Sequence, residues 1–155
     1  MNGTPDFESL LDLLLKNQIE FLVCGGVAVA LNGFVRTTED LDILVSAESR
    51  NIRNLLSTLK QFGEGHAALL SAEDFALEPG CVRLLEGDCP LDIFTLMGGL
   101  TYEQLLPDSV TTSVAGGRLQ VRHLNRQRLW ALKKDSRREK DRIDAAEMLR
   151  LDKSR

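Results

Sequence analysis

One segment of 25 residues, 21–45, constrains the fold more than any other part of this sequence. It begins with four apolar residues, Phe21–Cys24, which indicate a short buried strand. Gly25 and Gly26 end that strand, and a run rich in alanine and valine then continues to an Asn-Gly pair, a typical helix stop. After a polar connection, the apolar and β-branched residues of Leu41–Val45 predict a second strand. The segment therefore predicts a strand, a glycine turn, a helix and another strand in close succession.

Acidic residues stand at the start of the second strand and in a later apolar run. Asp40 and Asp42 are two positions apart, so both carboxylates project from one face of an extended chain. Folding gains nothing from two like charges beside an apolar strand, whereas a hard cation such as Mg²⁺ binds carboxylate oxygens and neutralises them. Asp92 lies in the apolar run 91–95, and if that run pairs beside Leu41–Val45 the three carboxylates converge. Three such groups can hold two metal ions about 3.5 to 4 Å apart, which activates an attacking oxygen and binds a transferring phosphoryl group.

The glycine pair fits the other half of that chemistry. A strand that ends in Gly25-Gly26 and passes directly into a helix lets backbone N–H groups approach a phosphate. Each feature alone has a simpler interpretation: the Asp pair as a solvated strand face, Asp92 as an edge-strand residue, and the glycines as a tight turn. Their joint order along the chain favours a functional site.

The rest of the sequence predicts one α/β domain, a small mixed sheet flanked by helices. We expect that domain to span residues 1–155, with a core at 19–122 and a C-terminal helical segment at 125–151. The expected helices are one around Leu10 to Leu15 and others at 47–62, 125–134 and 137–151. The expected further strands are 81–85 and 91–95, joined by a turn at 86–88, and 110–114 and 118–121, joined by a turn at 115–117.

Charge is unevenly distributed along the chain. Residues 1–117 carry 6 basic and 17 acidic side chains, whereas residues 118–142 carry 10 basic and 3 acidic, a net charge of +7. The overall charge of -4 argues against a surface that binds nucleic acid or membrane everywhere, so such a contact must be local. We expect no membrane span and no signal peptide, hence a cytoplasmic chain. The three cysteines form no Cys-x-x-Cys pair and predict free thiols.

The motif region resembles a known family. Gly25-Gly26 followed by Asp40 and Asp42, with fourteen positions from Gly26 to Asp40, is similar to the signature of the polymerase-β-like nucleotidyltransferases in their minimal bacterial form. The resemblance implies a nucleotidyltransferase fold in which Asp40, Asp42 and Asp92 hold two Mg²⁺ ions, or Mn²⁺, and Gly25 and Gly26 bind the nucleotide. Many relatives carry Ser where this chain has Gly26.

The C-terminal part resembles the same group more loosely, in enzymes related to toxin–antitoxin and phage-defence systems. By that resemblance Lys133 would neutralise triphosphate charge and Asp141 would position a substrate. The simpler alternative for this helix is a solvated face with Lys140 and Asp144 as an ordinary surface pair at i and i+4. Arg36, in the motif region, either supports the acidic strand or contacts phosphate, and the sequence does not choose between these roles.

The resemblance implies transfer of a nucleoside monophosphate from an NTP to a hydroxyl, with release of pyrophosphate. The acceptor is left open among RNA docked on the basic segment 118–142, a partner protein and a small molecule. The alternative function is a non-catalytic nucleotide-binding or antitoxin-like interaction module of the same fold.

Overall fold

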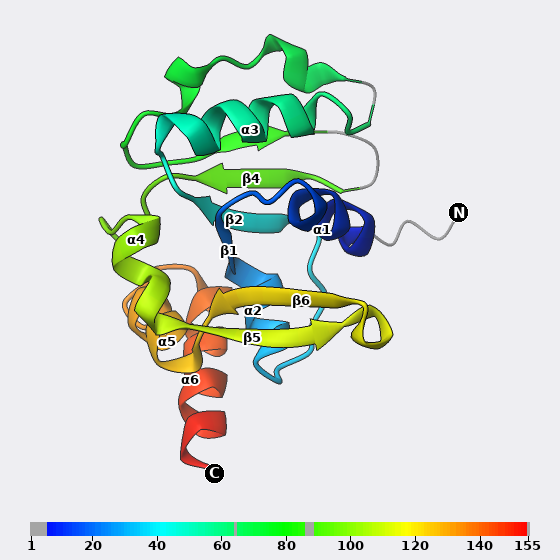
Figure 1. Cartoon of the computed structure of the whole chain (residues 1–155). Helices are drawn as coiled ribbons and strands as arrows, with labels where there is room; N and C mark the ends of the chain where they lie inside the picture. Colours follow the sequence, from blue (N-terminus) through cyan, green and yellow to red (C-terminus); the bar gives the residue numbers. More distant parts are fainter. Residues whose placement is uncertain (1–5, 64, 86–88, 155) are drawn as a thin grey trace.

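The computed structural model describes residues 6–63, 65–85 and 89–154. Within them a mixed sheet of six strands lies among six α-helices and four short 3-10 helices, so the predicted α/β class is confirmed (Figure 1). In chain order the elements are α1 Phe7–Lys16, β1 Phe21–Cys24, α2 Gly25–Leu31, β2 Leu41–Val45, α3 Ser49–Leu59, η1 His66–Leu69, η2 Ala72–Phe75, β3 Val82–Leu84, β4 Leu91–Phe94, α4 Tyr102–Leu105, η3 Leu106–Asp108, β5 Ser109–Val114, η4 Ala115–Gly117, β6 Leu119–Leu124, α5 Arg126–Lys133 and α6 Glu139–Lys153.

The strands lie in the order β3-β4-β2-β1-β6-β5. The pairs β3–β4, β1–β2 and β5–β6 are antiparallel, whereas β2–β4 and β1–β6 are parallel. The predicted neighbours 41–45 and 91–95 therefore do pair, and the strands of both predicted hairpins pair antiparallel. The turn expected at 86–88 lies outside the described residues.

The central strands are buried because both faces of the sheet are covered. In β2 every residue except Asp42 is buried, as expected for a strand with helices or loops on each side. Figure 1 shows α3 along the β3–β4 end of the sheet and the packed pair α5–α6 at the other end, near β5. The site described below lies between these parts. None of the described helices combines the length and apolar character needed to cross a bilayer.

Candidate active site

Four neighbouring strands bring one row of residues together. Across the sheet, Cys24 of β1 pairs with Asp42 of β2, Asp42 with Asp92 of β4, and Asp92 with Arg83 of β3. Directly paired residues place their side chains on the same face. The sequence placed Asp42 and Asp92 in different strands, and the parallel pairing of those strands makes their carboxylates neighbours. The alternative of Asp92 as an edge-strand residue is wrong, because β4 lies between β3 and β2.

The carboxylates of Asp42 and Asp92 are neighbours at a place that is largely removed from solvent. The Asp92 side chain is only 9% exposed. Burial, the neighbouring charge of Asp92 and, to a smaller extent, Asp40 raise the pKa of Asp42 to about 7. Burial is the largest of these causes, and the neighbouring carboxylates add to it. This cluster, Asp40, Asp42 and Asp92, is called the acidic cluster below.

One arginine contacts the acidic cluster. Arg83 donates from Nε to Oδ1 of Asp92 at 2.7 Å and from Nη2 to Oδ2 of Asp92 at 2.8 Å. The same Nη2 reaches Oδ2 of Asp40 at 2.9 Å. Sequence reasoning missed Arg83 entirely. Arg83 does lie in a predicted strand that neighbours the strand of Asp92. To infer their contact from the sequence, however, one would need the exact register of β3 on β4.

The donor chemistry of the acidic cluster fits Mg²⁺, which prefers carboxylate oxygens. The Asp42 carboxylate lies against Gly25, where a Cβ would overlap it. As the side chains lie, however, no three Asp, Glu, His or Cys groups of the described residues are arranged around a common metal position. In this arrangement Arg83 contacts two of the three carboxylates, Asp92 and Asp40.

The glycine pair forms the first two residues of α2, directly after β1. Gly25 has a φ of +68°, a left-handed conformation that favours glycine. Gly26 lies close to two side chains, so that a Cβ there would be 2.9 Å from Oγ1 of Thr38 and 3.0 Å from Nη2 of Arg36. Helix α2 begins at Gly25 itself, two residues before the apolar run that indicated it, and Cys24 at its N-cap makes no side-chain cap hydrogen bond.

A second cluster of charges joins the motif region to α6. Arg36 donates from Nε and Nη2 to the two carboxylate oxygens of Asp144, both at 2.7 Å. Lys133 donates to Asp144 at 2.9 Å and to Asp141 at 3.1 Å, and Asp141 also accepts from Ser136. The name "paired cluster" is used below for Arg36, Lys133, Asp141 and Asp144. Through Asp144, Arg36 is bonded to α6, a role that the sequence did not indicate.

Asp144 corrects one sequence-based expectation. Its side chain is 0% exposed, so it is not half of a surface pair with Lys140. The i,i+4 spacing indicated a local partner, whereas the actual partners Arg36 and Lys133 come from other elements. Burial raises the pKa of Asp144, but the hydrogen bonds from Arg36 and Lys133 outweigh burial and hold that pKa below its usual value.

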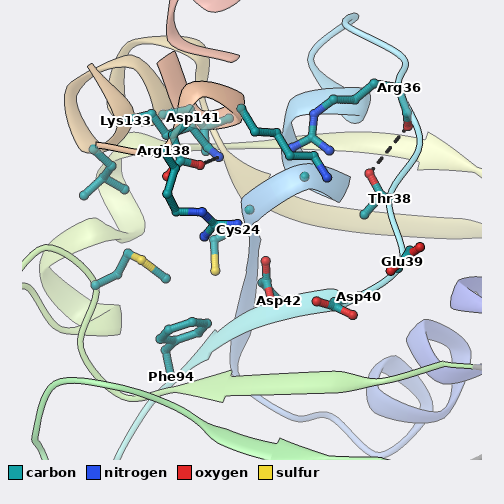
Figure 2. Close-up of a pocket in the computed structure, with 16 residues that line it drawn as sticks. Cys24, Arg36, Thr38, Glu39, Asp40, Asp42, Phe94, Lys133, Arg138 and Asp141 are labelled. Carbon is teal, nitrogen blue, oxygen red and sulfur yellow. Dashed lines mark hydrogen bonds and ion pairs between the residues drawn. The ribbon is translucent and has the colours of Figure 1, made fainter. Parts of the chain in front are cut away.

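A pocket of about 410 Å³, within the size range of small-molecule sites, is lined by part of each cluster. Asp92 and Asp144 do not line it. Figure 2 shows Asp40 and Asp42 on one side of the opening and Lys133, Arg138 and Asp141 on the other. The pocket is lined by Cys24, Gly25, Gly26, Arg36, Thr38, Glu39, Asp40, Asp42, Phe94, Met97, Leu129, Leu132, Lys133, Arg138, Lys140 and Asp141. The arrangement offers oxygen ligands on one wall and cationic groups on the other.

Two arginines of the basic segment 118–142 form contacts within the protein. Arg126 donates to the backbone carbonyls of Asn32 and Leu151, and Arg128 pairs with Asp108 at 2.7 Å. By contrast, Arg138 and Lys140 are exposed at the edge of the pocket. A charged acceptor at this site would therefore meet Arg138 and Lys140 first.

Comparison with known proteins gives a match at the level of fold. The crystal structure of an antigenic nucleotidyltransferase-like protein from Paracoccidioides brasiliensis aligns with a TM-score of 0.52, over 92% of this chain and 73% of that one. The two sequences are 17% identical, so the likeness shows the fold alone. No protein-family model matches the chain, and no curated protein matches it either. The chain has the α/β nucleotidyltransferase-like fold that its motif region predicted.

Proposed function

We propose that this chain is a metal-dependent nucleotidyltransferase, which transfers a nucleoside monophosphate from an NTP to a hydroxyl and releases pyrophosphate. The observation that carries the proposal is the pairing of Asp42 with Asp92 on adjacent parallel strands, at a pocket whose opposite wall bears Lys133 and Arg138. An excess of carboxylates at an open pocket binds a cation, and a cationic wall binds phosphate.

Each group has a proposed role. Asp40, Asp42 and Asp92 would hold Mg²⁺ or Mn²⁺, for which two ions are expected. When bound, such ions polarise the triphosphate and lower the pKa of the attacking hydroxyl. Gly25 and Gly26 would offer their backbone N–H groups to the phosphates at the start of α2. Lys133, itself held by Asp141 and Asp144, would present its ammonium group to the triphosphate from a fixed position, and this is the substrate-positioning role we give Asp141.

The test is transfer of label from each NTP in turn, with Mg²⁺ or Mn²⁺ and a cell extract as the source of acceptors. We expect Asp42→Asn to lower transfer at least about a hundredfold, because an amide is a poor metal ligand and even the loss of a supporting group near a metal costs tenfold or more. Asp12→Asn, which removes a carboxylate from α1, is the matched control and should transfer normally. Equal transfer by Asp42→Asn and wild type would refute the metal site.

A second candidate, a non-catalytic nucleotide-binding or interaction module, is favoured by the Arg83 contacts, because an arginine can neutralise an acidic cluster permanently. NTP binding by calorimetry separates the candidates. The enzyme should bind NTP only with a divalent ion, because Arg83 pairs with Asp92 and Asp40 and leaves the charge of Asp42 to repel the triphosphate. Equal affinity in excess chelator, together with no transfer to any acceptor, would favour the module.

Two experiments test the nature of the acceptor: the dependence of RNA affinity on salt, and charge reversal of exposed basic residues. If it is RNA, affinity should fall as salt rises, with a slope of about 0.7 to 0.9 per neutralised phosphate. The exposed residues Arg137, Arg138 and Lys140 are the ones to reverse in charge, because Arg126 and Arg128 are engaged within the protein. Unchanged labelling after reversal of all three would exclude RNA on this face and leave a small molecule or a partner protein.

A further inference from the structure

The contacts of Arg83 cover the hydrogen-bonding edge of Asp92. Both Asp92 oxygens accept from Arg83, one from Nε and one from Nη2, and Nη2 also bridges to Asp40. This two-nitrogen contact is the strong geometry for a carboxylate and an arginine. A divalent cation bound by Asp92 and Asp40 would need the same oxygens and would repel the guanidinium charge beside them. The arginine and the cation are therefore alternatives at this place.

The two partners differ in how freely they can move. Arg83 lies on β3, an edge strand of three residues, and its side chain is 47% exposed, whereas the Asp92 side chain is 9% exposed. The guanidinium can leave for solvent by rotation of its side chain alone, because water hydrates it there. Asp92 cannot turn away without losing its place in the sheet. The exchangeable partner is the arginine.

We propose that Arg83 is a displaceable counter-ion, which neutralises Asp92 and Asp40 in the metal-free protein and leaves them when a divalent cation binds. This inference rests on the proposed function, since it takes the acidic cluster to be a metal site. It accounts for an arrangement in which Asp40 and Asp42 line the pocket while the described acidic residues are not arranged around a metal position. Arg83 is thus a positioning residue that sets the affinity of the site for metal and does not act on the substrate.

The experiment titrates nucleotide-free protein with Mn²⁺ by calorimetry. Arg83→Gln should bind Mn²⁺ about tenfold more tightly than wild type, within the five- to 150-fold range usual for coupled binding equilibria. Arg83→Lys keeps the charge but lacks the two-nitrogen fork, and its affinity should lie between the two. Arg138→Gln removes a positive charge from the same pocket without touching Asp92, so it should change the affinity by less than about twofold.

Thermal melts provide the second readout. In chelator Arg83→Gln should melt below wild type, because Asp92 and Asp40 lose their partner, and saturating Mn²⁺ should close or reverse that gap. If Arg83→Gln binds Mn²⁺ no more tightly than wild type, or if Arg138→Gln gains as much, the inference is wrong while metal-dependent transfer by the wild type can still stand. If neither wild type nor Arg83→Gln binds Mn²⁺, the proposed function fails and the inference with it.

Discussion

The half-buried Asp42 of the acidic cluster and the buried Asp144 of the paired cluster have pKa values that are shifted in opposite directions. Asp144 receives hydrogen bonds from Arg36 and Lys133, and its pKa lies below its usual value. Asp42 is the neighbour of Asp92, and its pKa is raised to about 7. Burial raises the pKa of both carboxylates, so the difference between them comes from the charged groups beside each one. Hydrogen bonds from two cations outweigh burial at Asp144, whereas neighbouring carboxylates add to burial at Asp42.

The largest expected effect concerns stability in chelator. Asp144→Asn should lower the free energy of unfolding by about 3 kcal/mol, because it leaves two cationic groups without their buried partner. Asp42→Asn should leave that free energy unchanged or raise it, since it relieves repulsion from Asp92. Urea unfolding of both variants measures the contrast. A tolerated Asp144→Asn, or a costly Asp42→Asn, would break the comparison.

A smaller effect is expected beside the acidic cluster, at the glycine turn. Gly25→Ala should cost about 2 kcal/mol, because a left-handed conformation alone costs a residue with a Cβ about 1 to 2 kcal/mol and the Asp42 carboxylate is in the way. Gly26→Ala should cost less than about 1 kcal/mol, because the atoms in its way are the ends of the Thr38 and Arg36 side chains, which can shift.

The combination of Gly25→Ala with Asp42→Ala provides the control for the glycine turn. It should cost less than the sum of the two single changes, since Asp42→Ala makes room for the new methyl group. Additive costs in urea unfolding would show that the methyl group does not meet the Asp42 carboxylate.

The smallest expected effect is a dependence on pH. In the folded protein the pKa of Asp42 is about 7, above its ordinary 3.8, so the folded state binds more protons between these values. The stability from this group is therefore present at low pH and is lost as pH rises through about 7. Between pH 6 and 8 in chelator, wild type should lose about 1 kcal/mol relative to Asp42→Asn. Parallel pH profiles of the two proteins would show that Asp42 does not titrate in this range.

Local patterns predicted much of the fold. Phe21–Cys24 and Leu41–Val45 have the predicted bounds, because short apolar runs between glycines and charges allow little else. The helix expected at 47–62 is shorter, Ser49–Leu59, and the strand expected at 81–85 is Val82–Leu84. The ends of elements depend on packing against the rest of the chain, which local composition does not encode.

Long-range pairing accounts for what the sequence did not reveal at the site. The place of Asp92 at the site could be anticipated, because its apolar run predicted a strand that could pair beside Leu41–Val45. Arg83 could not, since its contact depends on the register of β3 with β4. The partners of Asp144 could not either, because Arg36 is 108 positions away in the chain. Local spacing indicated Lys140 instead, a residue that is exposed in the structure.

The 108-residue separation of Arg36 and Asp144 also has a consequence during protein synthesis. The chain acquires Asp40, Asp42 and Asp92 well before it acquires Lys133 and Asp144. At about 5 to 20 residues per second, the ribosome needs several seconds to add the segment between Asp92 and Asp144. During that time the nascent chain has its acidic residues but lacks Lys133 and Arg138, so it cannot bind a triphosphate as the finished protein is proposed to do. Arg83 emerges before Asp92 and is available to neutralise it throughout this interval.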